Sequence, residues 1–270
     1  MTPQLSRLVR VAPALALVVI AAWSARRVVG AGAAVPDDAA WAEAAAEVRA
    51  AQRPGELIVF APGWIEPVGR LHLGDRIPVD AAGRLDAARF PVIWELSVRG
   101  ARAAETRGLV ASHTATYRGV TVRRFDQVAR TVVTDFAPLL GRAVVAGPKS
   151  GGPSLVLAEV GFEPHRCAQL TPAADQAVTL TFADVELGTE LAIGVGLADV
   201  FTRRDVRDPG ELAVAVDGFE VARLRVGVDD GWVRHVAVTR PGRGTVTFTA
   251  RAVGLRATGR LICFAAEARQ

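Results

Sequence analysis

The sequence predicts a two-domain protein of the α+β class. A small α/β domain of Rossmann-like type is followed by an antiparallel β-sandwich of jelly-roll type, and a hydrophobic leader precedes both. Three observations support this fold: an uncharged apolar stretch near the N-terminus, helix and buried-strand patterns in the first half, and apolar–polar alternation in the second. At 270 residues the chain is long enough for two cores. We therefore expect a leader over residues 1–34, the α/β domain over residues 35–146 and the sandwich over residues 147–270.

The leader carries Arg7 and Arg10 and then runs without a charge over residues 11–25. This length suits the apolar core of a signal peptide better than a bilayer span, which needs about twenty residues. The pair Arg26-Arg27 follows directly, and a small-residue cleavage motif, Ala31-x-Ala33, comes only after it. A cleaved signal and an uncleaved transmembrane helix both remain open. Either one predicts an extracytoplasmic protein, anchored to the inner membrane or secreted to the periplasm.

The first domain begins with a helix that is capped by Asp37 or Asp38 and ended by Arg53-Pro54-Gly55. The continuous apolar runs 57–60 and 92–98 predict buried strands of a sheet that is covered on both faces. This order of helix and strand is typical of a small α/β unit. The remaining expected elements are helices over residues 64–73 and 101–107 and strands over residues 120–125 and 131–136.

From the turn-rich segment 147–153 onward, apolar and polar residues alternate. Short strands separated by turns at roughly ten-residue spacing predict an antiparallel sandwich. The clearest element is a hairpin whose two-residue turn is Asp217-Gly218, because these residue types adopt the positive φ angles that such a turn needs. The predicted strands cover residues 177–182, 191–197, 212–216, 219–226, 233–238, 246–250 and 261–265.

The net charge of +4 does not indicate a nucleic-acid partner. Lys149 is the only lysine and asparagine is absent, which points to a high-GC base composition rather than to selection for phosphate contacts. The arginines are spread among 28 acidic residues, and no basic run of five occurs. Because a protein that tracks phosphates needs a concentrated basic face, we expect no nucleic-acid binding.

The two cysteines, Cys167 and Cys263, predict a single disulfide in an oxidising compartment. The alternative is a pair of buried thiols that pack as small apolar residues. His165-x-Cys167 is the only close pair of metal ligands, and a structural zinc site needs two more at compatible spacing. We therefore predict neither a metal nor another cofactor.

The chain lacks the motif of a nucleophilic hydrolase. It has four histidines and no Gly-x-Ser-x-Gly sequence, so we assign no catalytic residue. Asp199, Asp205 and Asp208 lie in one loop, and Asp229 lies in a later turn. Two such acids facing one cleft would suit a carbohydrate-active enzyme. The alternative is that neighbouring arginines pair with them on the surface.

Two tryptophans stand beside turn residues and are candidates for a sugar-binding platform. Asp229 and Asp230 directly precede the Gly231-Trp232 pair, and Trp64 follows Gly63. The ligand-binding candidates are therefore Trp232, Asp229, Asp230 and Trp64. The alternative is that both indoles pack in cores and the two aspartates form a polar turn.

Two parts of the chain resemble known families. The first resemblance covers residues 40–140 and is carried by three motifs: Arg53-Pro54-Gly55-Glu56-Leu57-Ile58-Val59-Phe60, Pro62-x-Trp64 and Phe90-Pro91-Val92-Ile93-Trp94-Glu95-Leu96. This region resembles the soluble extracytoplasmic domain of polytopic lipid-linked-sugar glycosyltransferases. In that family the catalytic acid lies on a loop between membrane helices, and this chain, with at most one such segment, has no matching position. The second half is similar in pattern to galactose-binding-like or jelly-roll sandwiches, a likeness of architecture alone.

These patterns predict a non-catalytic accessory or binding protein of the cell envelope, acting near surface glycan or its assembly machinery. One alternative is a structural module that binds another envelope protein. The other alternative is an extracytoplasmic carbohydrate-active enzyme. A membrane contact is expected through the N-terminal segment if the leader stays uncleaved.

Overall fold

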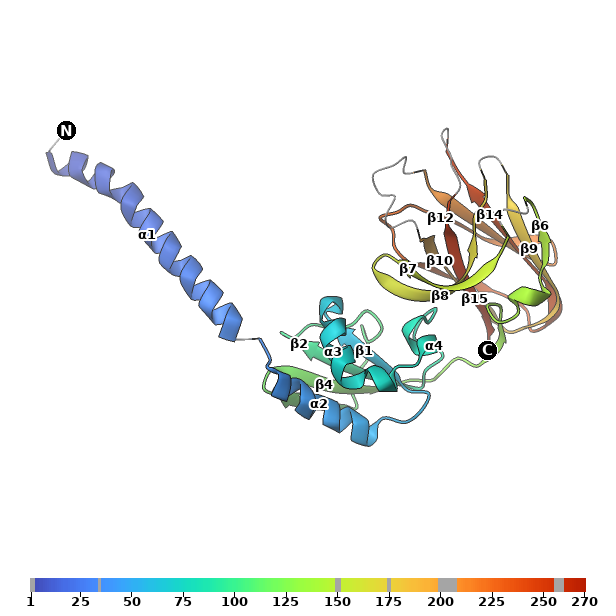
Figure 1. Ribbon diagram of the computed structural model, residues 1–270, viewed down its shortest axis with the longest axis horizontal. Helices are drawn as coiled ribbons and strands as arrows, with labels where there is room; N and C mark the ends of the chain where they lie inside the picture. The colour runs from blue at the N-terminus through green and yellow to red at the C-terminus, as the bar shows by residue number, and fades with distance from the viewer. Residues whose placement is uncertain (1–2, 34, 149–151, 174–175, 199–207, 255–259) are drawn as a thin grey trace. The chain divides into compact units, whose positions relative to one another are not determined.

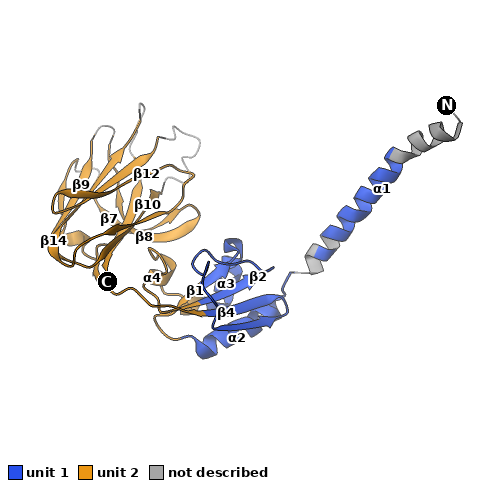
Figure 2. Ribbon diagram, turned by 180° about the vertical axis from the view of Figure 1, so that it is seen from behind, with its two compact units in different colours: residues 1–52, 59–73, 94–124 blue, residues 53–58, 74–93, 125–270 orange. Residues whose placement is uncertain are grey.

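The computed structural model describes the backbone of residues 3–33, 35–148, 152–173, 176–198, 208–254 and 260–270. The chain divides into two compact units (Figure 2). Unit 1 contains residues 1–52, 59–73 and 94–124, and unit 2 contains residues 53–58, 74–93 and 125–270. The chain therefore passes between the two units more than once, whereas the sequence predicts a single boundary near residue 146.

The predicted leader forms one long helix, α1 (Pro3–Ala33), drawn in blue in Figure 1. Apolar side chains in its middle, such as Leu17 and Trp23, are exposed. Within the described part of the chain, no helix combines the length and the apolar character that a membrane span requires.

Unit 1 contains helices and most of a small four-stranded sheet. Its strands are β1 (Leu57–Ala61), β2 (Val92–Val98), β3 (His113–Tyr117) and β4 (Val120–Asp126), in the order β1-β2-β4-β3. Both β1 and β2 are buried along their whole length, as their continuous apolar sequences predict. The strands β3 and β4 pair antiparallel.

The helices of this region are α2 (Asp38–Ala51), the 3-10 turn η1 (Gly63–Ile65) and α3 (Glu66–Leu73). The Asp37 side chain caps α2 by accepting a 2.8 Å hydrogen bond from the Ala40 amide, as predicted. The α/β character is present, while the Rossmann-like arrangement stays a prediction.

The predicted helix over residues 101–107 is wrong, because this segment is a set of turns. The side chain of Glu95, fully buried on β2, accepts hydrogen bonds from the Ala103 amide and from the Thr106 hydroxyl. Arg123 adds a 2.8 Å ion pair to the same carboxylate. A buried carboxylate needs such partners, and these bonds hold the loop in a non-helical path.

Unit 2 contains the predicted β-sandwich, made of two antiparallel sheets that we call sheet B and sheet C. Sheet B has the order β13-β10-β15-β8-β7, with β5 also paired to β15, and sheet C has the order β12-β11-β14-β9-β6. Unit 2 also carries η2 (Gly74–Arg76) and α4 (Val79–Ala82). The strands are β5 (Val132–Asp135), β6 (Val144–Ala146), β7 (Ser154–Val160), β8 (Glu163–Leu170), β9 (Val178–Leu187), β10 (Glu190–Leu197), β11 (Gly210–Val216), β12 (Phe219–Val226), β13 (Val233–Val238), β14 (Gly242–Ala252) and β15 (Ile262–Arg269).

The strands β5 and β6 lie before the expected domain boundary, yet they pair with β15 and β9 of the sandwich. Both strands are four residues or shorter, so their own pattern does not show which sheet they join. Their pairing extends the sandwich toward the N-terminus. The strands β7 and β8, which the sequence analysis did not predict, form a further hairpin of sheet B.

The hairpin turn at Asp217-Gly218 is confirmed. Val216 pairs with Phe219, so the loop between β11 and β12 has two residues. Both turn residues have positive φ angles, 50° and 83°. The Asp217 carboxylate also accepts a 2.8 Å hydrogen bond from the Thr245 amide, which ties the turn to β14.

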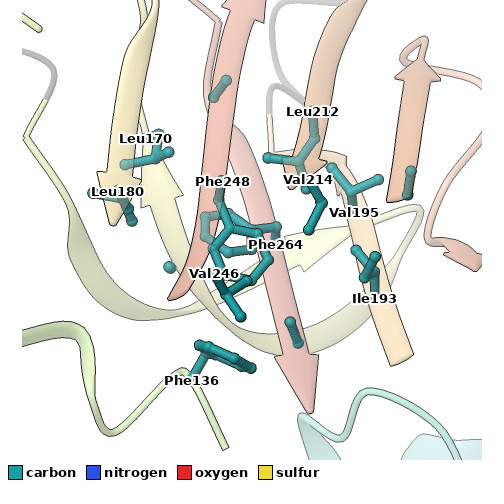
Figure 3. Packing of buried hydrophobic residues seen from close by; sticks show 14 of the residues in the cluster. Phe136, Leu170, Leu180, Ile193, Val195, Leu212, Val214, Val246, Phe248 and Phe264 are labelled. Carbon is teal, nitrogen blue, oxygen red and sulfur yellow. The ribbon is translucent and has the colours of Figure 1, made fainter. Parts of the chain in front are cut away.

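The core of the sandwich lies between the two sheets (Figure 3). Phe136 packs edge-on against Phe182 and Phe248, each at 5.2 Å between ring centroids, and Phe248 stacks on Phe264. In Figure 3, Phe248 and Phe264 lie together among aliphatic side chains from both sheets. Phe136 directly follows β5. Because its ring packs in this core, the segment after unit 1 belongs to the sandwich.

Candidate functional site

Trp232 lies against sheet B on the face that points away from the core. Because Ile193 belongs to the core, its neighbour Gly194 on β10 faces the other way. A Cβ atom at Gly194 would overlap the Trp232 indole, so glycine at this position admits the ring. The indole Nε1 donates a 3.2 Å hydrogen bond to the Leu85 carbonyl. Trp232 is thus a half-buried packing residue, with its polar atom already satisfied.

His165 stacks on this indole. The two ring centroids are 4.1 Å apart and the rings are 9° from parallel. His165 is only 6% exposed, and its Nδ1 lies 3.3 Å from the Arg84 carbonyl. Because a carbonyl only accepts hydrogen bonds, the proton of the neutral ring is on Nδ1. The sequence analysis treated His165 only as a metal ligand, and the stacked pair is a result of tertiary folding.

Burial lowers the pKa of His165 from 6.5 to about 4. The hydrogen bond to Arg84 opposes this shift, and the positive charges of Arg84 and Arg234 add to it. Nε2 has no hydrogen-bond partner among the described residues, and the Glu163 carboxylate is 3.9 Å away. The ring is therefore held neutral.

A chain segment covers this face of sheet B, and we call residues 83–90 the strap. The Gly83 carbonyl accepts a 2.8 Å bond from the Arg166 amide, and the strap then continues through the Arg84 and Leu85 contacts described above. Asp86 accepts two bonds of 2.9 Å from Arg269, whose side chain is 1% exposed. The strap is fixed in place by side chains of β8 and β15 and by Trp232.

A second ion pair strengthens the end of the strap. Arg89 lies 3.1 Å from the buried Glu267 carboxylate, and Glu267 also pairs with Arg269. Burial raises the pKa of Glu267, while the two arginines oppose that shift. These buried charges are paired with one another, so their role is structural.

The disulfide predicted between Cys167 and Cys263 is present, joining β8 to β15 with 5.5 Å between the Cα atoms. Both cysteines are fully buried and pack with Val160 and with Trp232. The bond and the indole therefore lie in one cluster on the outer face of sheet B.

The candidate aspartates have different surroundings. Asp229 and Asp230 are exposed, and Asp230 accepts a 2.7 Å bond from the Gly227 amide, which closes a turn. The Asp208 carbonyl accepts a 2.8 Å bond from Arg260. Asp199 and Asp205 lie outside the described residues. Across the described part of the chain, no three His, Cys, Asp or Glu side chains are grouped so that they could hold a metal ion.

Trp64 lies in unit 1, in the turn between β1 and α3, and its side chain is 65% exposed. The next residue, Ile65, is buried and anchors the turn. Gly69 of α3 meets the ring of Phe60 on β1 so closely that a Cβ atom there would overlap the ring. The helix is therefore packed tightly on the strand, and this packing fixes the turn that presents Trp64.

Arg99 lies beside the Trp64 ring, with its guanidinium carbon 5.9 Å from the ring centroid. Arg99 follows the last residue of β2, and β1 and β2 are neighbours in the sheet. Added Cβ atoms at Gly63 and Gly100 would meet no other atom within 4 Å, so the space around the pair is open. The sequence analysis missed Arg99, since only the sheet brings residues 64 and 99 together.

The four candidate ligand-binding residues belong to two different units. Asp229, Asp230 and Trp232 share one loop of unit 2, in which the indole is packed and the aspartates are exposed. Trp64 belongs to unit 1 and is the exposed indole of that set.

No protein-family model matches the sequence, and no curated protein matches it. Among solved structures, the chain is similar to the tandem family 51 carbohydrate-binding modules of a family 98 glycoside hydrolase from Streptococcus pneumoniae. The identity is 11%, the TM-score is 0.34, and the match covers 57% of this chain and 56% of that one. The chain thus spans about half the length of that structure.

Two single modules are similar as well. A family 51 module from Clostridium perfringens, solved with methyl-galactose, has 11% identity and a TM-score of 0.31 over 46% of this chain and 92% of that one. A family 35 module from Clostridium thermocellum has 10% identity and a TM-score of 0.30 over 52% and 98%. These three structures are carbohydrate-binding modules, and their scores are too low to assign a family or a ligand to this chain.

Proposed function

We propose that this chain is a non-catalytic binding protein of the cell envelope, that it acts outside the cytoplasm, and that it binds glycan through Trp64. The observation that carries the proposal is the 65% exposure of this indole in an open turn. The exposed ring presents a large apolar surface that a ligand can cover. The flat apolar face of an indole fits the C–H face of a pyranose ring.

The other candidate platform, Trp232, is less suited to this role. Its ring is stacked on His165 and its Nε1 is bonded to Leu85, so a sugar would have to displace both. Trp64 needs no such rearrangement. Of the four candidates, the proposal therefore rests on Trp64 of unit 1.

The proposed location outside the cytoplasm rests on two features. The leader forms a long helix with apolar residues exposed along its middle, and the two cysteines form a disulfide. Disulfides persist in oxidising compartments such as the bacterial periplasm. We therefore propose that the protein is exported, with its leader either cleaved or retained.

A glycan array probed with the full chain in its oxidised form tests this function. Wild type should bind at least one glycan saturably, and Trp64→Ala should lose that binding without a change in thermal stability, since the ring is mostly exposed. Phe219→Ala is the matched control, because Phe219 is also an exposed aromatic residue, at 78%. A silent array, or binding that Trp64→Ala leaves intact, would overturn the proposal.

A structural module that binds another envelope protein is the second candidate. The observation that favours it is the exposure of two apolar side chains, Val68 and Leu71, on α3, the helix that follows Trp64. Leu71→Ser separates the two functions, because it should weaken a protein contact on α3 and leave glycan stacking at Trp64 unchanged. The carbohydrate-active enzyme remains a prediction, since two of its acids lie outside the described residues.

A further inference from the structure

Several arginines near the sheet of unit 1 have carboxylate partners. Arg70 pairs with Glu66, Arg118 with Glu43, and Arg123 with the buried Glu95. Among the described residues, no carboxylate pairs with Arg99, and its side chain contacts the Trp64 ring instead. An exposed aromatic surface and an unpaired cation therefore stand next to each other.

The backbone holds Arg99 in this position. Its φ angle is 55° and that of Gly100 is 70°, so two successive residues adopt the left-handed region, which residues other than glycine rarely enter. The Ala101 amide donates a 3.1 Å hydrogen bond to the Val98 carbonyl and closes the turn. Since all of β2 is buried, the turn begins from a fixed point.

We propose that Trp64 and Arg99 together bind a sugar that carries a carboxylate, such as a uronic acid. The indole covers the apolar face of the pyranose ring, and the guanidinium pairs with the carboxylate at its edge. A guanidinium suits this task because its planar N–H groups match the two oxygens of a carboxylate. This inference rests on the proposed function and adds the chemical class of the ligand.

The test compares acidic polysaccharides with their own neutral forms. Polygalacturonate, alginate and hyaluronan are each measured beside the carboxyl-reduced polymer, which keeps the sugar rings and lacks the charge. The full-length, oxidised protein is used as wild type, Trp64→Ala and Arg99→Gln. Arg107→Gln is the matched control, because Arg107 is an exposed arginine of the same unit.

We expect wild type to bind at least one acidic polymer roughly tenfold or more tightly than its reduced form, since charge-assisted hydrogen bonds are the strong ones. Arg99→Gln should abolish this preference and retain binding to the neutral form. Arg107→Gln should behave as wild type, and added salt should weaken only the binding of the acidic polymer.

Three kinds of result would overturn the inference, and they are distinguishable. If acidic and reduced polymers bind equally and Trp64→Ala abolishes both, the glycan-binding function stands and the acidic ligand is refuted. If no polymer of either kind binds, or if Trp64→Ala has no effect, both proposals fall. A preference for the acidic polymer that survives in Arg99→Gln would refute the role of Arg99 alone.

Discussion

Protonation of one residue, His165, should lower the stability of the sandwich in acid. Its pKa is about 4 in the folded protein and 6.5 in the unfolded chain, so the unfolded state binds the proton more readily between these values. The free energy of unfolding therefore decreases as the pH falls from 6.5 to about 4. At about 1.4 kcal/mol for each pH unit, this difference amounts to about 3 kcal/mol. Below pH 4 the residue should contribute no further change.

The His165→Phe variant isolates this effect from the carboxylates that titrate in the same range. Phenylalanine keeps a ring beside Trp232 and cannot take up a proton, and it removes the hydrogen bond to the Arg84 carbonyl. The variant should lose about 1 kcal/mol at neutral pH for that bond. Between about pH 7 and pH 4 it should then lose about 3 kcal/mol less than wild type does.

Urea denaturation at a series of pH values, followed by circular dichroism of the sheet signal, provides the free energies. Wild type and variant are compared at each pH, so that titrations common to both cancel. Parallel curves for the two proteins would refute the reasoning, because they would mean that His165 takes up its proton in the folded state as easily as in the unfolded one.

Three further changes should lower the stability of unit 2 in chemical denaturation. Trp232→Ala should cost about 3 kcal/mol, the low end of the range for a buried tryptophan, because the ring is only half-buried. A loss of less than about 1 kcal/mol would contradict its packing role. Replacing Cys167 and Cys263 by alanine should cost up to about 4.7 kcal/mol, since the bond closes a sequence separation of 96 residues, and unchanged stability would argue against the bond. Asp86→Ala should cost about 3 kcal/mol, because it leaves the buried Arg269 with one partner fewer. The control is Asp230→Ala, at an exposed turn, which should cost less than about 1 kcal/mol.

Local patterns predicted those elements whose cause is local. The cap at Asp37, the buried strands β1 and β2 and the hairpin at Asp217-Gly218 each depend on a few adjacent residues. The helix expected at residues 101–107 failed because Glu95, a buried carboxylate on a neighbouring strand, captures the Ala103 amide and the Thr106 hydroxyl. Such competition between a side chain and a helix is invisible in the segment itself.

The candidate site also combines features that the local sequence predicts with features that depend on the tertiary structure. The sequence by itself singled out Trp64 and Trp232 as tryptophans beside turns, without a means to tell them apart. Only the tertiary structure decided that one ring packs against Gly194 and His165, while the turn after β1 exposes the other beside Arg99. Composition and periodicity determined the class of many elements, because burial on one or two faces leaves a repeating pattern. Exposure and partnership are properties of residues far apart in the chain, and strand pairing alone brings those residues together.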